Sequence, residues 1–344
     1  MENTGKILVT GAAGFLGPRV VLRLCAHGHR QIRCLVRDRN KLPRLQNVAD
    51  QYPEARLEFC FGNLKSASDL TRALDGVDLV FHLAAAMKGT PADMFLDSVV
   101  ASRNLLDAIS DRKPMRVVLV STFGVYGVSG LGRGALVNEQ TPLEAHPERR
   151  DPYSHSKLAQ EQLFWDYQRK HGFELVVVRP GVIYGPGGGQ FSVRVGLNLF
   201  GVFLHLGGAN QLPLTYVDNC AEAIVVAGSH PDATGQVYNV HDDGVVTSRQ
   251  YLRAYKKNVR RIRSIRVPYP AMMLLSQAVE AYHRYSHGQM PAVFTPYKTA
   301  ANWGGNRFDN SKLKSIGWKQ LIGTEDALAR TFQEFRAPAP PAGA

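Results

Sequence analysis

Cysteine is scarce in this chain, and its residues form no recognisable motif. There is no CxxC pair, and the four cysteines stand singly among apolar neighbours, at Cys25, Cys34, Cys60 and Cys220. Such positions are typical of buried, reduced thiols and not of a disulfide framework. The histidines form no HExxH motif. We therefore expect no metal site.

Long apolar runs are also missing. No uninterrupted apolar stretch approaches the roughly 18 residues that a membrane-spanning helix requires. The first residues lead directly into an apolar strand, without the apolar segment and cleavage site of a signal peptide. We expect a cytoplasmic globular protein, because 44% of its 344 residues are hydrophobic and 20% are charged.

Positive charge is in excess, with a formal net charge of +12. Seven Lys and Arg residues fall between Arg253 and Arg266. We favour a solvated face of a helix and its loop as the interpretation of this segment. The alternative is peripheral contact with anionic lipid, because Pro270 to Tyr285 has the pattern of an amphipathic helix. No basic motif interleaved with aromatics supports a nucleic-acid partner.

Short apolar segments alternate with helical patterns through the first half of the chain. Helices are expected at Phe15–His27, Ser66–Leu74, Pro91–Ile109 and Tyr153–Lys170. Strands are expected at Lys6–Thr10, Ile32–Val36, Leu57–Phe61, Val77–Leu83, Val117–Ser121 and Glu174–Arg179. Strands separated by such helices indicate crossover connections and a parallel sheet. The pattern predicts an α/β fold, a Rossmann-type doubly wound parallel sheet.

Three glycines stand between the first strand and the first helix, in the segment Thr10-Gly11-Ala12-Ala13-Gly14-Phe15-Leu16-Gly17. Glycines at this turn permit close approach of a pyrophosphate and packing of the helix on the sheet. The free N–H groups at the helix N-terminus can bind phosphate. This strand–turn–helix context predicts dinucleotide binding.

The pattern loosens after Pro180, where a smaller C-terminal substrate lobe is expected. We expect residues 1–180 to form an NAD(P)-binding Rossmann domain, completed from 212–242 by a helix at Asn219–Gly228 and a strand at Val237–Val240. Residues 181–336 would then form mainly the substrate-binding lobe. Residues 337–344 contain only Ala, Pro and Gly and are expected to be a flexible tail.

The GxxGxxG spacing resembles the extended short-chain dehydrogenase/reductase superfamily, which includes NAD-dependent epimerases and dehydratases and a 3β-hydroxysteroid dehydrogenase branch. Other matching motifs, between Lys6 and Arg336, are His82-Leu83-Ala84-Ala85, Asn104-Leu105-Leu106, Arg179-Pro180, Tyr184-Gly185-Pro186 and Tyr216-Val217-Asp218-Asn219. The resemblance implies a small-molecule substrate and a homodimer. It implies cofactor contacts from Gly11, Ala13, Gly14, Phe15, Leu16, Arg37, Asn63, Leu64, Leu83, Ala84, Ala85, Ser121, Tyr153, Lys157, Pro180 and Val182, and substrate contacts from Met87, Phe123 and Tyr184.

The end of the second strand bears on the choice between NAD and NADP. An acidic residue there would bind the ribose 2′-hydroxyl, whereas an arginine would bind a 2′-phosphate. The strand continues into Arg37, followed by Asp38. The planar guanidinium of Arg37 suits phosphate, so NADP is favoured over NAD.

Tyr153 and Lys157 form a YxxxK pair at the start of a helix. Residues four apart share a helix face, so the Lys157 ammonium is expected to lower the pKa of the Tyr153 phenol. Such a phenol can act as an acid or a base. By resemblance, Thr122 is the third catalytic residue and hydrogen-bonds the substrate oxygen, with Ser121 as the alternative, while Lys157 holds the nicotinamide ribose.

Three reactions of the superfamily remain open. A 4,6-dehydratase would need an acidic pair after Thr122, where this chain has Phe123-Gly124. A nucleotide-sugar 4-epimerase would usually carry an arginine within 209–215, which has none, although Arg194 or Arg253 could take its place. A simple dehydrogenase or reductase acting on a carbinol or ketone is favoured, because residues 212–219 and 306–330 resemble the hydroxysteroid branch. A non-catalytic NADP(H)-binding regulator is the alternative of another class.

Overall fold

The protein, described here by a computed structural model, has a central sheet with helices on both faces. The structure describes residues 5–110, 112, 115–287 and 294–336, so the tail expected at 337–344 lies outside the described residues. Within the described part, no helix combines the length and the apolar character needed to cross a membrane.

Seven parallel strands form the central sheet, in the order β13-β7-β5-β4-β1-β2-β3. They are β1 (Lys6–Thr10), β2 (Gln31–Val36), β3 (Arg56–Phe61), β4 (Val77–His82), β5 (Arg116–Val120), β7 (Glu174–Pro180) and β13 (Val237–Val240). Each coincides within one residue with an expected strand. The order reverses between β1 and β4, where an open α/β sheet forms a crevice for a ligand. The Rossmann-type α/β fold is confirmed.

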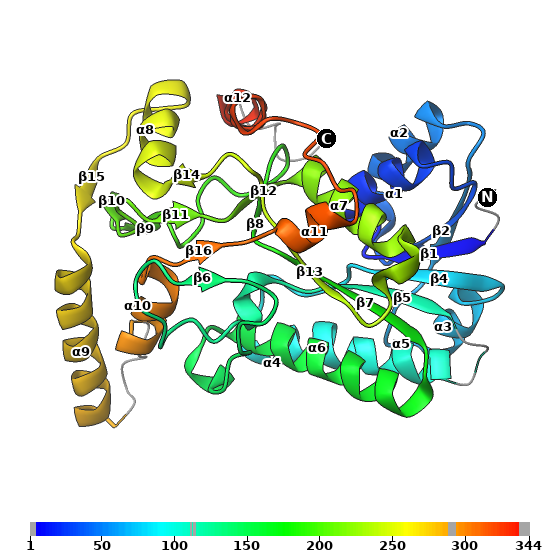
Figure 1. Ribbon diagram of the computed structural model, residues 1–344, viewed down its shortest axis with the longest axis horizontal. Helices are drawn as coiled ribbons and strands as arrows, with labels where there is room; N and C mark the ends of the chain where they lie inside the picture. The colour runs from blue at the N-terminus through cyan, green and yellow to red at the C-terminus, as the bar shows by residue number, and fades with distance from the viewer. Residues whose placement is uncertain (1–4, 111, 113–114, 288–293, 337–344) are drawn as a thin grey trace.

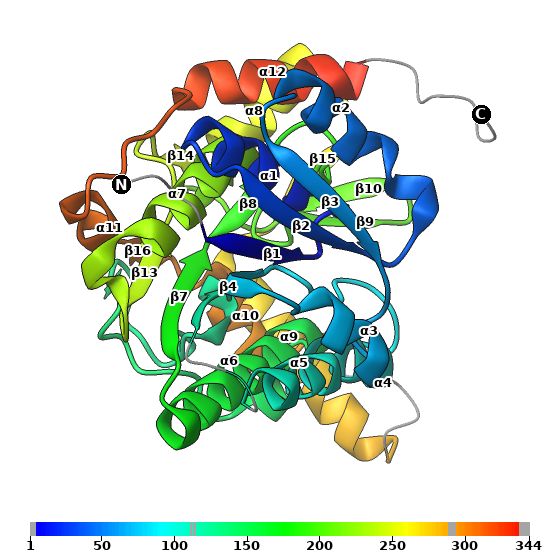
Figure 2. The ribbon, with the colours of Figure 1, turned by 90° about the vertical axis from the view of Figure 1, so that its right-hand side faces the viewer.

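Two helical layers sandwich the sheet (Figures 1 and 2). One layer contains α1 (Gly17–Ala26), α2 (Pro43–Gln51) and α7 (Val217–Ser229). The other contains α3 (Ala67–Ala73), α4 (Pro91–Phe95), α5 (Ala101–Ser110) and α6 (Pro152–His171). Each layer packs its own apolar cluster against one face of the sheet. Six of the strands are therefore largely buried on both sides, as their nearly continuous apolar sequences require, whereas the edge strand β3 alternates apolar and charged residues and is partly exposed.

The helix expected over Pro91–Ile109 is interrupted. A π-helical turn, η2 (Leu96–Val100), separates α4 from α5. The inserted turn places Asp97 and Ser98 near the carboxyl ends of the strands, where Ser98 Oγ accepts a hydrogen bond from the backbone N–H of Ala86. Single π turns are rare and occur frequently at functional sites.

Short strands and further helices form the smaller part of the molecule, to the left in Figure 1. A three-stranded sheet has the order β15-β10-β9, and three two-stranded pairs lie around it. The strands are β6 (Leu136–Val137), β8 (Val182–Tyr184), β9 (Gly196–Leu199), β10 (Val202–His205), β11 (Gln211–Leu212), β12 (Leu214–Tyr216), β14 (Val246–Thr247), β15 (Ser264–Arg266) and β16 (Arg307–Phe308). The helices are α8 (Ser248–Asn258), α9 (Tyr269–Tyr285), α10 (Pro296–Trp303) and α12 (Thr324–Arg336), whereas α11 (Ser311–Ser315) packs beside β13 of the central sheet.

Local signals set the ends of α6, the helix that carries Tyr153 and Lys157. Asp151 caps its N-terminus by accepting a hydrogen bond from the Ser154 N–H, and Pro152 occupies the first turn. Gly172 ends the helix in the left-handed conformation, with φ of 72°. Tyr153 therefore lies in the first turn of α6, at the end of the helix near the loop that follows β5.

Candidate active site

The three glycines after β1 serve different purposes. Gly11 has φ of 69°, and a Cβ atom there would lie 2.9 Å from the Ala84 nitrogen. A Cβ on Gly17 would lie 2.2 Å from the Ala12 oxygen, because α1 packs closely on the turn. Gly14 is exposed, and its Cβ would meet only the Gly11 oxygen, at 3.1 Å. The fold thus requires Gly11 and Gly17, whereas Gly14 keeps open the surface that faces a cavity.

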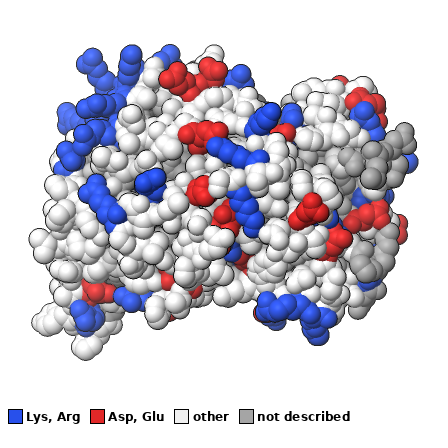
Figure 3. All heavy atoms as spheres, viewed as in Figure 1, with Lys and Arg blue, Asp and Glu red and all other residues white. Residues whose placement is uncertain are grey.

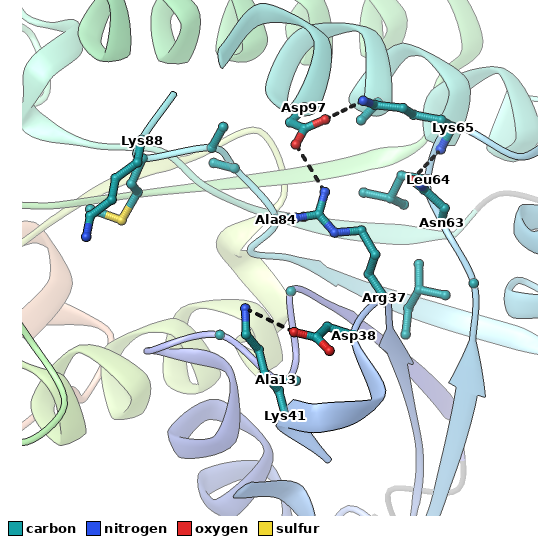
Figure 4. Close-up of a pocket in the computed structure, with 18 residues that line it drawn as sticks. Ala13, Arg37, Asp38, Lys41, Asn63, Leu64, Lys65, Ala84, Lys88 and Asp97 are labelled. Carbon is teal, nitrogen blue, oxygen red and sulfur yellow. Dashed lines mark hydrogen bonds and ion pairs between the residues drawn. The ribbon is translucent and has the colours of Figure 1, made fainter. Parts of the chain in front are cut away.

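That cavity has a volume of about 460 Å³ and lies at the carboxyl ends of β1, β2 and β4 (Figure 4). It is lined by eight of the residues expected to bind the cofactor, which are Gly11, Ala13, Gly14, Arg37, Asn63, Leu64, Ala84 and Ala85. Met87, expected at the substrate, also lines it. Bare backbone at the start of α1 and a roomy cavity beside it fit a nucleotide diphosphate.

Two cations share one carboxylate at the edge of this cavity. Arg37 Nη1 lies 3.0 Å from Asp97 Oδ2, and Lys65 Nζ lies 2.5 Å from Asp97 Oδ1 (Figure 4). The hydrogen bond from Lys65 and the charge of both cations hold the pKa of Asp97 below its usual value, although burial opposes them. Sequence reasoning found Arg37 but missed Lys65 and Asp97, since nothing in the sequence marks the π turn that presents Asp97.

Asp38, the acidic residue that could bind a ribose, makes a hydrogen bond to its own backbone segment. Its Oδ1 accepts from the Asn40 N–H at 3.1 Å and so caps the short helix η1 (Arg39–Lys41). Its Oδ2 lies 3.7 Å from Lys41 Nζ. With Lys88, four cations and two carboxylates line the cavity, so its charge is positive on balance.

Tyr153 and Thr122 come together where the loop after β5 meets α6. Burial, followed by the nearby Asp151 carboxylate, raises the pKa of Tyr153 to about 12, and a hydrogen bond with Thr122 opposes this shift. The expectation that Lys157 lowers this pKa is wrong for this structure. Lys157 Nζ is buried and donates to the Val120 carbonyl at 2.7 Å and to Gln160 Oε1. Burial in turn lowers the pKa of Lys157 to about 7.

Behind Lys157 lies a buried polar network that sequence reasoning did not find. Gln160 Nε2 donates to Ser102 Oγ at 2.7 Å and lies 3.2 Å from His82 Nε2. His82 Nδ1 lies 2.8 Å from Thr10 Oγ1. Burial and the Lys157 charge lower the pKa of His82 to about 3, which makes the ring a neutral link. This chain of hydrogen bonds connects Lys157 to the first strand.

Ser121 turns away from Tyr153 into a second buried network. Its Oγ donates to Glu161 Oε2 at 2.5 Å, and Glu161 forms a buried ion pair with Arg179. The Arg179 guanidinium lies over the Tyr126 ring, 4.7 Å from its centre. The Ser121 hydroxyl is therefore engaged elsewhere, which corrects its expected part as an alternative to Thr122. Its place directly before Thr122 remains consistent with a cofactor contact through the backbone.

The remaining expected cofactor residues do not line the 460 Å³ cavity. The side chains of Phe15 and Leu16 pack against the apolar cluster of the smaller part of the molecule. Leu83 follows β4, and Pro180 and Val182 lie where β7 ends and β8 begins. Leu83 and Pro180 stand at the carboxyl ends of β4 and β7, and Val182 follows β7 directly after Gly181. A ligand that crosses this edge of the sheet would pass these positions.

Two of the residues expected at the substrate are buried. Tyr184 is 3% exposed and donates from its hydroxyl to Asp242 Oδ2 at 3.1 Å. Phe123 is 4% exposed and stacks on Phe308, with the ring centres 5.1 Å apart. The Tyr184 phenol is thus engaged within the core, and its expected contact with the substrate stays a prediction. Phe123 supports the loop of Thr122 from behind.

Arg194, one of the two arginines that could replace the one absent from 209–215, lies over the same ring stack. The Arg194 guanidinium is 5.7 Å from the centre of the Phe308 ring. Burial, and then the positive charge of Arg150, lower its pKa to about 10, while Asp151 opposes the shift. Arg150 is paired with Glu144 at 3.0 Å. Within residues 5–110, 112, 115–287 and 294–336, the Arg194 guanidinium has no hydrogen bond or ion pair.

Comparison with known proteins agrees with this geometry. A family model described as the NAD dependent epimerase/dehydratase family matches residues 7–240. This segment contains the glycine turn, the cavity and the Thr122, Tyr153 and Lys157 side chains.

Individual relatives are named for different reactions. An uncharacterised UDP-glucose epimerase of Bacillus subtilis is 29% identical over 68% of this chain and 76% of its own length. A decarboxylating sterol-4-alpha-carboxylate 3-dehydrogenase of Candida albicans is 25% identical over 96% of this chain and 97% of its own. The crystal structure of a UDP-glucuronic acid 4-epimerase from Bacillus cereus with NAD is 18% identical, covers 96% of this chain and 98% of its own, and superposes with a TM-score of 0.71, a likeness of fold alone.

Proposed function

Because the chain belongs to the NAD dependent epimerase/dehydratase family, we propose that it is an NADP(H)-dependent oxidoreductase acting at a carbinol or ketone carbon. Cofactor binding is assigned to residues 1–180 with 212–242, and substrate binding mainly to 181–336. Tyr153 is the acid or base, Thr122 orients the substrate oxygen and Lys157 supports both.

The observation that carries the choice of NADP over NAD is the engagement of Asp38. Its carboxylate caps η1 and pairs with Lys41, so it is less available to a ribose 2′-hydroxyl. Arg37 and Lys41 lie on either side of it and line the cavity. A 2′-phosphate could take Arg37 from the carboxylate that it shares with Lys65, because one carboxylate does not neutralise two cations.

The side chains at the reacting end suit proton transfer in the direction of reduction. When bound, the nicotinamide ring supplies or accepts the hydride. A Tyr153 pKa near 12 keeps the phenol protonated at neutral pH, ready to donate to the oxygen of a ketone. Thr122, a hydrogen-bond partner of Tyr153, can hold the same oxygen. Lys157 is held by Val120 and Gln160, which fixes its position before any ligand binds.

A second candidate function, nucleotide-sugar epimerase, is favoured by Arg194. A guanidinium without a partner among the described residues, close to the start of α6, could bind the diphosphate of such a substrate. It would stand in for the arginine absent from 209–215. The UDP-glucose epimerase among the relatives gives this candidate further support.

The nucleotide held by the purified protein separates the two candidates. The protein would be denatured and the released nucleotide identified by mass spectrometry, and empty protein would be titrated with NADPH and NADH. A reductase that exchanges its cofactor each turnover is expected to be empty and to bind NADPH more tightly. Tightly held NAD⁺ would contradict the proposed function and support the epimerase, which regenerates its cofactor in each cycle.

A further inference from the structure

Helix α9 leaves most of its surface uncovered. Of its 17 residues only Met272 and Ser276 are buried. Along the opposite side, apolar residues recur at spacings of three and four and form one continuous stripe. The members of this apolar stripe, all exposed, are Ala271, Leu274, Leu275, Ala278, Ala281, Tyr282 and Tyr285. Leu274 is 67% exposed and Tyr285 is 82% exposed, so the stripe is an unused interaction surface.

The opposite side of α9 anchors it to the rest of the molecule. Met272 packs in a small apolar cluster with Leu206 and Trp303. Ser276 Oγ lies 2.5 Å from Thr299 Oγ1 of α10. These contacts use the side of α9 that faces α10, and they therefore turn the apolar stripe outward.

A basic segment directly precedes α9. It consists of seven residues on α8, on β15 and between them, which are Arg253, Lys256, Lys257, Arg260, Arg261, Arg263 and Arg266. All but Lys256 are exposed. In the described part of the chain none of the seven forms an ion pair, and the segment itself contains no acidic residue. Among the described residues, its cations therefore have no carboxylate within ion-pair distance.

The basic segment and the apolar stripe follow one another along one edge of the molecule. Figure 1 shows α8, β15 and α9 in a column at the left, and Figure 3 shows Lys and Arg gathered over the upper part of this column. Phe200, 96% exposed with φ of 49°, lies at the turn between β9 and β10, and β10 pairs with β15. A cavity of about 340 Å³, lined by Arg266 and Arg133 among others, lies beside the start of α9.

We propose that the basic segment and the apolar stripe together dock the protein onto a bilayer that contains anionic lipids. Such a bilayer presents negative headgroups above an apolar interior, and this surface offers the matching cations and apolar side chains in sequence. Tyr282 and Tyr285 add amphipathic rings of the kind that favour the interface between water and lipid.

Other occupants fit the surface less well. A second copy paired through the apolar stripe would cover the apolar side chains but offer no anionic partner to the basic segment, which contains no acidic residue. Nucleic acid would neutralise the cations but leave the apolar stripe exposed to water. The bilayer is the partner that accounts for both halves of the surface.

The test uses the full chain and sedimentation with vesicles. Vesicles of phosphatidylcholine alone are compared with vesicles that also contain phosphatidylglycerol, at low and at high salt. We expect binding only to the anionic vesicles, and less of it at high salt because exposed charges are screened. Arg260→Gln/Arg261→Gln/Arg263→Gln should lower the partition coefficient about 100-fold. Leu274→Ser/Leu275→Ser should lower it about tenfold.

A matched control removes three exposed cations from elsewhere, with Arg44→Gln/Lys170→Gln/Lys319→Gln. Retained vesicle binding by this variant supports the proposal. A loss equal to that of the Arg260→Gln/Arg261→Gln/Arg263→Gln variant would show that binding depends only on the net charge of the protein, and would overturn the proposal. Absence of binding to anionic vesicles at low salt would also overturn it. So would a dimer that Leu274→Ser/Leu275→Ser converts to a monomer while vesicle binding stays unchanged. None of these measurements requires turnover, so they stand or fall independently of the proposed function.

Discussion

The two ends of the candidate cofactor site are built differently. At one end, Arg37, Lys41, Lys65 and Lys88 line an open cavity, and the exposed Arg37 and Lys65 make ion pairs that are easily exchanged. At the other end, Lys157 is 2% exposed and is held by hydrogen bonds before any ligand arrives. Exposed pairs contribute little to stability and can be redirected to a ligand, whereas buried polar groups must be satisfied within the fold.

This difference indicates how the site divides its tasks. The open end can distinguish one nucleotide from another by charge, since its side chains can move at little cost. The buried end cannot move without leaving polar groups unpaired, so it suits a reaction that depends on fixed geometry. Substitutions at the buried end should change rate or stability, and substitutions at the open end should change affinity.

Tyr153→Phe should have the largest effect on turnover. Loss of a general acid typically costs roughly 10²- to 10⁴-fold in rate. The affinity for NADPH should stay within a few-fold of the wild-type value, because the ring remains and the open cavity is untouched. Steady-state rates and cofactor titration would be measured on the same preparation. Retained turnover would remove Tyr153 from the mechanism and, with it, the distinction drawn between the two ends.

The fold was predictable from the sequence because most strands of the central sheet are short apolar runs, and the edge strand β3 alternates charged and apolar residues. Val237–Val240 could be placed although it lies far along the chain. The strands of the smaller part were not predicted, since elements such as β11 and β16 are only two residues long and owe their existence to their partners.

The candidate site likewise contains residues that the sequence could identify and residues that it could not. Gly14, Thr122, Tyr153 and Lys157 stand in local motifs, and the structure places Gly14 at the cavity and Thr122 beside Tyr153. Asp97 and Gln160 were missed, because their significance arises from contacts with residues 60 or more positions away. The hydrogen bond between Tyr184 and Asp242 was not predictable either, since the two residues lie 58 positions apart.

Lys157→Met should change how the free energy of unfolding depends on pH, because Lys157 is buried at the reacting end of the site. The Lys157 pKa falls to about 7 in the folded protein, so between pH 7 and its ordinary value of 10.5 the unfolded chain binds more protons. Stability of the wild type therefore rises with pH in that window, by up to about 1.4 kcal/mol per pH unit. The Met variant lacks this contribution. Urea denaturation at pH 7, 8, 9 and 10 would measure the difference.

Lys88→Met supplies the comparison from the open end. Lys88 is exposed at the cavity, so the stability of this variant should run parallel to that of the wild type across the same pH range. If the free energy of unfolding of Lys157→Met also ran parallel to that of the wild type across this pH range, the Lys157 ammonium would not be desolvated. The contrast between the two ends would then lose its energetic basis.

Gly14→Val should weaken cofactor binding without unfolding the protein. The added Cβ meets only the Gly11 oxygen within the protein, and Gly14 lines the cavity where the nucleotide would lie. Overpacking of this kind costs about 1–3 kcal/mol, or roughly 10- to 100-fold in affinity. Gly17→Val is the control, because its side chain would clash with Ala12 and should lower the melting temperature instead. Equal loss of stability in both variants would contradict the separate purposes of the two glycines.

Arg37→Ala should have a smaller effect than Gly14→Val but a more specific one. If Arg37 leaves Asp97 to bind a 2′-phosphate, its loss should reduce the affinity for NADPH about tenfold, the equivalent of one charge-assisted hydrogen bond. The affinity for NADH should change little. Lys65→Ala tests the same carboxylate from its other side, since it removes the cation that shares Asp97 and tightens the hold of Asp97 on Arg37. It should therefore also weaken NADPH, by a smaller factor. An equal loss of affinity for NADPH and NADH in Arg37→Ala would mean that the open end binds the nucleotide without recognising its 2′-phosphate.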